Sequence, residues 1–263
     1  MAGILYLIPT PLGEAGNTSS GNTTSGNPSA LSHVLPEETR RIAAGLTHFI
    51  VEQAKTARAF LKQLPTSTPI QQLTLRELNE HTPASELETL IAPLLAGQDV
   101  GLISEAGCPA VADPGANLVR LAHQHGIRVR PLTGPSSILL ALMGSGLVGQ
   151  RFAFHGYLPA KADERTTALR ELERRAQKED AAQVFIETPY RNQAMLDSIL
   201  ASCQADTLLT LACDLTLDSE YLITRPVSGW RKQQPDIQKR PTVFLLYVPS
   251  QPTPRQNLSR TRK

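Results

Sequence analysis

The segment Gly101–Gly115 combines glycine, proline and acidic side chains in a pattern suited to holding a ligand. A short apolar run stops in a loop that contains two prolines and the carboxylates Glu105 and Asp113, and a helical pattern begins at Asn117. The pattern predicts a strand, a long loop and a helix. In open α/β sheets, ligands lie in such loops at the carboxyl ends of strands. Glycine lets a backbone approach a ligand, and proline fixes the path of the loop. The alternative is an ordinary tight turn, although such turns need only a few residues.

Two further loops of small residues follow apolar runs. The first is Pro9-Thr10-Pro11-Leu12-Gly13, and the second is Thr133-Gly134-Pro135-Ser136-Ser137. The second loop has two interpretations. It is a ligand loop, or Ser136 or Thr133 simply caps a helix that starts at Ile138.

Strand and helix patterns alternate along the first half of the chain. Strands are expected at residues 3–8, 47–51, 100–104 and 127–131, and helices at 36–44, 54–62, 83–96, 117–125 and 138–143. This alternation is typical of right-handed βαβ units in a mostly parallel sheet. In the second half, strands are expected at residues 152–155, 183–187, 207–213, 220–224 and 242–248, and helices at 164–177 and 193–202. The late strands follow one another without long helices, which favours antiparallel pairing. The fold class is therefore α/β, with a mixed second sheet.

A loosening of the pattern around Gly144, Gly146 and Gly149 marks the expected domain boundary. We expect an N-terminal domain over residues 1–148 and a C-terminal domain over residues 149–249. Of the twenty residues 13–32, fifteen are Gly, Ser, Thr or Asn, which predicts a flexible insertion. Residues 250–263 are rich in Pro, Gln and Arg and are expected to be a disordered tail.

The composition of the 263-residue chain, 41% hydrophobic with a net charge of +2, indicates a globular protein with a substantial core. No apolar run reaches membrane-spanning length, and Met1–Ile8 lacks the basic start of a signal peptide. The cysteines, Cys108, Cys203 and Cys213, have neither metal-site nor disulfide-framework spacing. We therefore expect a cytoplasmic protein without a membrane segment or a metal site.

Basic side chains are unevenly distributed. One group falls on an expected helix, a second lies later in the chain, and a third is in the tail: Arg165, Arg170, Arg174 and Arg175; Arg231, Lys232, Lys239 and Arg240; Arg255, Arg260, Arg262 and Lys263. Such groups can contact nucleic-acid phosphates. The alternative is a solvated helix face and a frayed tail.

The three loops, together with Gly156-Tyr157-Leu158-Pro159 and Glu187-Thr188-Pro189-Tyr190-Arg191, resemble the tetrapyrrole-methylase-like superfamily of S-adenosylmethionine (SAM) methyltransferases. Within it, the chain is most similar to the small-subunit ribosomal RNA 2′-O-methyltransferase I branch. The similarity covers roughly Ile4 to Val248, with the five motifs in order.

The resemblance implies two α/β domains with the cofactor in a cleft between them, a homodimer, and methylation of a ribose in 16S-like ribosomal RNA or the small ribosomal subunit. By resemblance, the residues that contact SAM are Pro9, Thr10, Glu105, Ala106, Gly107, Cys108, Pro109, Gly134, Pro135, Ser136, Ser137, Glu187 and Thr188. The alternatives are methylation of another RNA or a small molecule, and SAM binding without catalysis.

The chain departs from the family pattern mainly on the substrate side. The family's Ala-Glu-Asp-Thr-Arg appears here as Val51-Glu52-Gln53-Ala54-Lys55, and its late Arg-Glu-Leu-Thr-Lys as Cys213-Asp214-Leu215-Thr216-Leu217. In the central loop, Glu105 and Cys108 replace Asp and Thr. The motifs therefore support SAM binding more strongly than an RNA substrate.

Methyl transfer to a ribose hydroxyl needs an in-line arrangement and a base or a desolvated setting for the nucleophile. Glu105 is the preferred catalytic residue, and the other candidates are Asp113, Glu187 and His155. Asp113 could instead initiate a turn, and His155 could be a satisfied residue at a strand end. Arg191 suits a phosphate or carboxylate contact, so we assign Arg191 and His155 to substrate binding. The alternative for Arg191 is an ion pair with Glu187.

Overall fold

The computed structural model describes residues 2–13 and 31–249, and the contacts divide the chain into two compact units. The first unit comprises the residues up to Leu140 together with Leu215–Ser219, and the second comprises Ala141–Asp214 and the residues from Glu220 onward. The domain limits at residues 148 and 249 stay a prediction. Most of the insertion predicted at 13–32, and the tail predicted at 250–263, lie outside the described residues.

The first unit is built on a fully parallel five-stranded sheet with the order β3-β2-β4-β1-β5. In chain order its elements are β1 (Ile4–Ile8), α2 (Glu37–Gly45), β2 (His48–Val51), α3 (Ala54–Leu61), β3 (Thr74–Glu77), α4 (Leu87–Leu95), β4 (Val100–Ile103), α5 (Ala116–Gln124), β5 (Arg128–Pro131) and the first half of α6 (Ser137–Ser145). The expected parallel sheet is confirmed. One expected helix, over residues 83–96, begins as a 3-10 turn at Ala84–Glu86 before α4.

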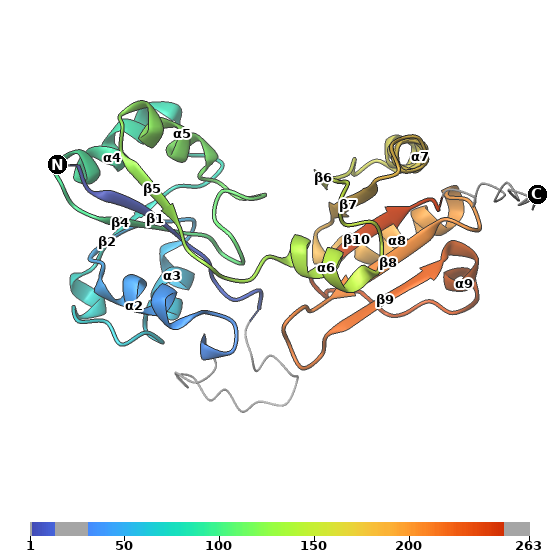
Figure 1. The fold of residues 1–263 in the computed structure, drawn as a ribbon, viewed down its shortest axis with the longest axis horizontal. Coiled ribbons are helices and arrows are strands. Elements are labelled where there is room, and N and C mark those ends of the chain that lie inside the picture. Colours follow the sequence, from blue (N-terminus) through green and yellow to red (C-terminus); the bar gives the residue numbers. More distant parts are fainter. Residues whose placement is uncertain (1, 14–30, 250–263) are drawn as a thin grey trace, which may run out of the picture. The chain divides into compact units, whose positions relative to one another are not determined.

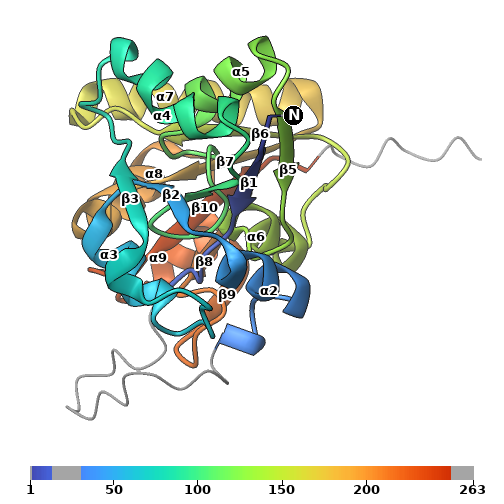
Figure 2. The same ribbon diagram turned by 90° about the vertical axis from the view of Figure 1, so that its left-hand side faces the viewer.

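Right-handed crossovers place the helices of the first unit on both faces of its sheet. Helices α2 and α3 pack on one face around Phe49 and Val51, and α4 and α5 pack on the other around Ile50 and Leu102. Figures 1 and 2 show α4 and α5 above the strands and α2 and α3 below them. The chain leaves β1 toward the α2 face and leaves β4 toward the α5 face. Because β1 and β4 are neighbours, the carboxyl edge of the sheet has its topological switch point between them.

The second unit contains a mixed sheet with the order β6-β7-β10-β8-β9. Its elements are β6 (Phe152–Tyr157), α7 (Ala162–Glu179), β7 (Ala182–Ile186), α8 (Asn192–Ser202), β8 (Leu208–Cys213), β9 (Tyr221–Pro226), α9 (Val227–Lys232) and β10 (Thr242–Tyr247). Strands β6 and β7 are parallel, and β10 pairs antiparallel with β7 and β8. The pairing of β8 with β9 is also antiparallel, which confirms the expectation for the late strands.

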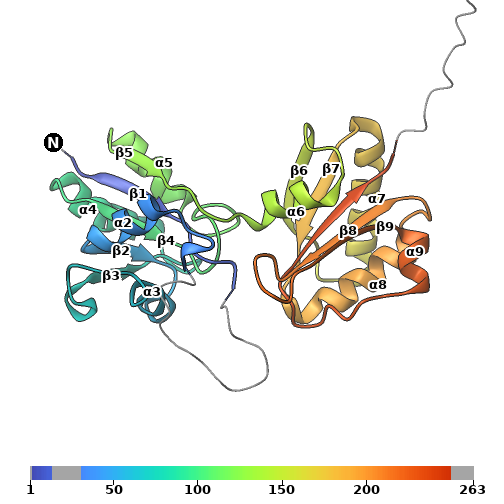
Figure 3. The same cartoon turned by 60° about the horizontal axis from the view of Figure 1, so that its bottom comes forward.

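The core of the second unit lies between its sheet and the helices α7, α8 and α9 (Figure 3). Phe185 and Phe244 stack with ring centroids 5.5 Å apart. The fully buried Trp230 of α9 donates from its indole nitrogen to the Leu209 carbonyl at 2.9 Å. Since α9 supplies this buried indole, the sequence prediction, which lacked α9, missed part of the core.

Candidate functional site

The loops after β1 and β4 are joined across the switch point of the first sheet. The Thr10 N–H donates to the Gly107 carbonyl at 2.9 Å, and the Gly107 N–H donates to the Thr10 carbonyl at 3.1 Å. The Thr10 hydroxyl, which is almost fully buried, donates to the Ser104 carbonyl at 3.3 Å. Two of the three sequence-predicted loops are therefore hydrogen-bonded to each other at the edge where open α/β sheets bind ligands.

The loop after β5 packs against the other two. A Cβ atom placed on Gly134 would lie 2.4 Å from the Pro9 Cβ, a distance that real side chains do not reach. The Cys108 thiol donates to the Pro135 carbonyl at 3.4 Å. Only glycine allows this approach of Gly134 to Pro9, so the structure brings all three predicted loops of the first unit together.

Strained backbone is concentrated in the loop between β4 and α5. Positive φ angles occur at Gly107 (75°), Ala110 (63°), Ala112 (62°) and Gly115 (132°). For the two alanines, this conformation costs about 1–3 kcal/mol each. Residues held in such conformations cluster at ligand clamps and active sites, so this loop is a candidate clamp.

Three carboxylates gather at this edge of the first unit: Glu52 after β2, and Glu105 and Asp113 after β4. The Thr56 hydroxyl at the start of α3 donates to Glu105. The Ser104 hydroxyl donates to the Gly107 carbonyl at 3.2 Å and also lies close enough to Asp113 to lower the pKa of that carboxyl. The Glu52 Oε2 atom is buried and has no hydrogen-bond partner among the described residues.

Burial and the negative charge of Glu52 raise the pKa of Asp113 to about 7. Burial also raises the pKa of Glu52, and a hydrogen bond with the backbone of Glu105 partly opposes this effect. A carboxyl group whose pKa is close to neutrality can accept and release a proton at physiological pH. Among the acids of this edge, Asp113 is therefore well suited to general base catalysis.

Ser136 fulfils the capping role that the sequence allowed. Its Oγ atom accepts a hydrogen bond from the Leu139 N–H, at 3.4 Å, in the first turn of α6. Capping fixes the direction of the loop after β5 without removing it from the cluster of loops. The two interpretations of this segment are therefore compatible.

In the second unit, Glu187 and Arg191 form an ion pair. The Glu187 side chain is 1% exposed, and its Oε1 atom accepts from the Thr188 N–H at 2.6 Å and from Arg191 Nη2 at 2.7 Å. Its Oε2 atom is buried and has no hydrogen-bond partner in the described part of the chain. The side chain of Arg191 is 44% exposed, so the buried carboxylate orients a cation that reaches the surface.

His155 lies on β6 and contacts a buried glutamine. Its Nε2 atom is 2.8 Å from Gln183 Oε1, while the Gln183 amide nitrogen donates to the Ala181 carbonyl at 2.9 Å. Because the glutamine oxygen accepts, His155 Nε2 carries the proton. The histidine is a satisfied residue of the second unit, as the alternative interpretation stated.

Five of the eight basic side chains in the two groups that the structure describes are engaged within the chain. Arg165 is buried and donates to the Ala160 carbonyl at 2.8 Å. Arg231 donates to the carbonyl of Cys203, and Arg240 pairs with Asp214. Arg174 and Arg175 both pair with Glu171. These contacts occupy part of the charge at these positions, and phosphate binding by the basic groups stays a prediction.

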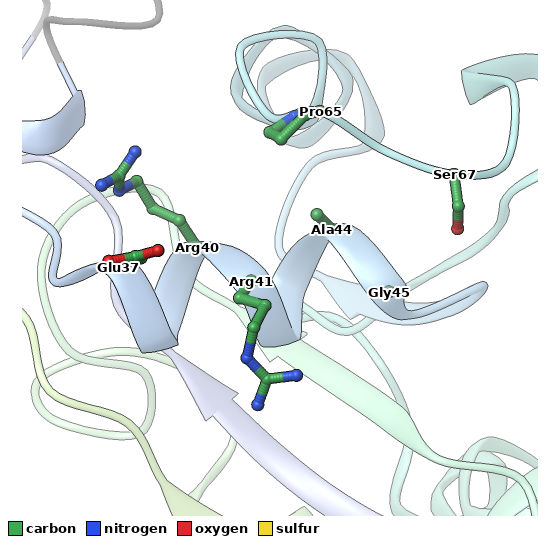
Figure 4. A pocket seen from close by; sticks show the side chains of 7 residues that line it. All are labelled: Glu37, Arg40, Arg41, Ala44, Gly45, Pro65 and Ser67. Carbon is green, nitrogen blue, oxygen red and sulfur yellow. The ribbon is translucent and has the colours of Figure 1, made fainter.

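The structure also adds a residue to the site. Thr56 fixes Glu105 from a position 49 residues away in the sequence, and no pattern in the sequence marks this contact. A hollow of about 440 Å³ runs along α2, lined by Glu37, Arg40, Arg41, Ala44, Gly45, Pro65 and Ser67 (Figure 4). None of these residues belongs to the three loops, so the hollow is a feature apart from the carboxyl-edge site.

Within residues 2–13 and 31–249, no group of three or more His, Cys, Asp or Glu side chains is arranged to hold a metal ion. In the same part of the chain, none of the helices has the length and apolar character needed to cross a membrane.

Comparisons with known proteins place this geometry in a family. The model of the Tetrapyrrole (Corrin/Porphyrin) Methylases matches residues 34–228. The chain is 32% identical over 247 residues to a protein of Escherichia coli O157:H7 named ribosomal RNA small subunit methyltransferase I, covering 93% of this chain and 77% of the relative. A Pseudomonas aeruginosa protein of the same name is 32% identical over 248 residues, covering 93% of this chain and 79% of the relative.

Solved structures show the same fold. The methyltransferase CobJ matches with a TM-score of 0.59 at 17% identity and covers 94% of both chains. The cobalt precorrin-4 methyltransferase CbiF matches with a TM-score of 0.55 at 11% identity, covering 93% of this chain and 94% of the other. With this fold, and with a family model that matches most of its length, the chain belongs to the Tetrapyrrole (Corrin/Porphyrin) Methylases.

Proposed function

We propose that the chain is a SAM-dependent methyltransferase that methylates a ribose 2′-hydroxyl of small-subunit ribosomal RNA. The observation that carries this proposal is the joining of the three loops at the switch point of the first sheet, Thr10 paired with Gly107 and Gly134 packed on Pro9. Relatives at 32% identity that are named ribosomal RNA small subunit methyltransferase I support the choice of substrate. Such a substrate would place the enzyme in the cytoplasm.

The first unit holds SAM through the backbone of its loops. The residues proposed for this contact are Pro9, Thr10, Glu105, Ala106, Gly107, Cys108, Pro109, Gly134, Pro135, Ser136 and Ser137. Two glycines support this fit. Gly107 has a positive φ of 75°, and Gly134 packs against Pro9, so both positions present backbone and no side chain to the ligand. When bound, SAM supplies an electrophilic methyl group on a sulfonium. Contacts of Glu187 and Thr188 with SAM stay a prediction.

Two carboxylates of the loop after β4 are candidates for the base. Glu105 is the residue that the sequence favoured, and it accepts a hydrogen bond from the Thr56 hydroxyl. Asp113 lies near Glu52 in a half-buried setting that raises its pKa to about 7. We assign proton removal from the ribose hydroxyl to Asp113, and we assign to Glu105 the fixing of the loop against α3.

The second unit offers groups for the RNA. Arg191 presents a partly exposed guanidinium that the buried Glu187 holds in place, and guanidinium forks match phosphate oxygens. His155 is held by Gln183, so its contribution to substrate binding is the less direct of the two.

A homodimer is part of the proposal. Leu139 and Met143, one turn apart on α6, are 52% and 78% exposed, and Phe152 and Tyr157 on β6 are also exposed. Exposed large apolar side chains mark association sites when they gather.

Changing both Leu139 and Met143 to Lys is expected to convert a dimer to a monomer in light scattering coupled to size-exclusion chromatography. The matched control is Leu95→Lys, since Leu95 is another exposed leucine (47%) in the first unit. Equal masses for the wild type and the double variant would contradict this role of α6.

The proposed function is tested in a strain that lacks the gene. Primer extension on its small-subunit ribosomal RNA should show the loss of one stop that marks a 2′-O-methylated ribose, and the wild-type gene should restore it. An unchanged map would contradict the ribosomal RNA substrate and leave another RNA or a small molecule as the acceptor.

A further inference from the structure

The two helical layers of the first unit differ in charge. Residues 31–77, which form α2, α3 and β3, carry six basic side chains and four acidic ones. Residues 78–127, which form α4, α5 and β4, carry six acidic side chains and Arg120 as their single basic one. The layer that contains α2 and α3 is therefore the cationic side of this unit.

The basic charge of this layer is concentrated on α3 and on Lys62, the residue that follows its last turn. Lys55, Arg58 and Lys62 follow one another at spacings of three and four residues, so they form one row along the helix, and all three are exposed. Among the described residues, none of the three forms an ion pair, and Arg58 Nη1 reaches only the Ala54 carbonyl, at 3.5 Å. We call these three residues the basic stripe.

The basic stripe begins beside the candidate site. Thr56, the neighbour of Lys55, donates to Glu105 in the loop after β4. The N–H of Ala54 donates to Glu77 Oε1 at 2.9 Å, which fixes the start of α3 at the carboxyl edge of the sheet. From there the stripe extends about 10 Å along the helix, at 1.5 Å per residue. It therefore leads away from the edge where methyl transfer is proposed.

The segment that follows the stripe packs against α2. After Lys62 the chain turns through Pro65 and Ser67, which line the hollow along α2 with Arg40 and Arg41 (Figure 4). The Ser67 N–H donates to the Ala44 carbonyl at 3.4 Å and holds this segment against α2. Arg41 pairs with Glu38 at 2.8 Å and Glu37 also lines the hollow, so α2 adds no net positive charge to the basic stripe.

We propose that the basic stripe binds backbone phosphates of the RNA substrate next to the site of methyl transfer. This inference rests on the proposed function. Unpaired lysines and arginines neutralise nucleic-acid phosphates and supply sequence-independent affinity. Among the described residues, none of the exposed large apolar side chains lies on α3. The stripe therefore lacks the apolar anchors of protein interfaces and of membrane-bound helices, which favours RNA.

The test replaces Lys55, Arg58 and Lys62 together by Gln in the full chain. A fluorescently labelled fragment of unmodified small-subunit ribosomal RNA is titrated at several salt concentrations between about 50 and 200 mM. The slope of log K against log salt is expected to become less steep by about 2, since each single-strand phosphate contact contributes about 0.7. Affinity at the lowest salt should fall by about 10- to 100-fold.

A matched control variant removes three exposed charges elsewhere, at Arg120, Arg128 and Lys178. It should keep the wild-type slope, and both variants should keep the wild-type Tm and the wild-type affinity for SAM. Equal loss of slope in the two triple variants would overturn the inference, because it would show a diffuse charge effect.

Three other outcomes separate the inference from the proposed function. If the wild type binds and methylates RNA and the stripe variant behaves like it, the inference fails and the proposed function stands. If the stripe variant binds naked RNA normally but methylates assembled small subunits slowly, the stripe contacts a ribosomal protein, and the inference is overturned. If the wild type neither binds nor methylates RNA, the proposed function itself fails.

Discussion

Asp113→Asn is expected to lower kcat for methyl transfer by about 10²- to 10⁴-fold, the usual contribution of a general base, and to leave SAM affinity nearly unchanged. Asn keeps the shape of the side chain and a hydrogen-bonding group for Ser104, but it does not accept a proton. Steady-state kinetics with small ribosomal subunits, combined with calorimetric titration of SAM, measures the two effects separately.

The dependence on pH distinguishes a base from a merely structural residue. The wild type should lose activity as the pH falls through about 7, where Asp113 becomes protonated. The residual activity of Asp113→Asn should not decrease in this pH range. Glu105→Gln is the comparison variant, and its activity should decrease below about pH 7 as that of the wild type does. A rate loss in Glu105→Gln together with a normal rate in Asp113→Asn would assign the base to Glu105 and contradict our choice.

The same substitution should affect stability in the opposite direction. The folded-state pKa of Asp113, about 7, lies above its ordinary value of 3.8, so the fold disfavours the charged form. The destabilisation develops as the pH rises from about 4 to about 7 and is complete above that range. Asp113→Asn should therefore raise Tm more at about pH 8 than at about pH 5, a sign of the strain that active sites carry.

Gly134→Ala is expected to weaken SAM binding by at least about 100-fold and to lower the stability of the protein by about 1–3 kcal/mol, a typical cost of overpacking. The added Cβ would lie 2.4 Å from the Pro9 Cβ and 3.1 Å from Leu35 Cδ2. The loops after β1 and β5 would have to separate, and Cys108 would lose its contact with Pro135. Calorimetry with SAM and with its demethylated product measures the affinity, and thermal unfolding measures the stability.

Gly45→Ala is the matched control for this experiment. Gly45 is the last residue of α2, and a Cβ there would meet nothing within 4 Å. Alanine at this position should leave SAM affinity unchanged. Wild-type affinity in Gly134→Ala, with a normal Tm, would show that the packing of the loops does not form the SAM site.

The sequence predicted the architecture well where burial leaves a strong pattern. The strands β1, β2 and β4 are short apolar runs in a buried parallel sheet, and such runs stand out against amphipathic helices. Strand β3 was missed because Thr74–Glu77 has a single apolar residue and sits, mostly exposed, at the sheet edge. Helix α9 was missed because it has only six residues and contains Gly229.

The site was predictable in its loops and not in its electrostatics. Glycine and proline after apolar runs marked the three loops, but the pairing of Thr10 with Gly107 joins residues almost a hundred positions apart. The half-buried position of Asp113 near Glu52 also arises only in the folded sheet. The sequence analysis placed Arg165 in a basic group on a helix, either solvated or in contact with phosphates. In the folded chain Arg165 is buried and donates to the Ala160 carbonyl.

The most direct test of the account is methyl transfer by the purified protein. Small ribosomal subunits from a strain without the gene are incubated with SAM labelled in its methyl group, and the ribosomal RNA is digested to nucleosides. The account predicts label in a single 2′-O-methylated nucleoside, and no transfer by Asp113→Asn on the same timescale. Label in a base, or no transfer by a folded wild-type protein that binds SAM, would contradict it.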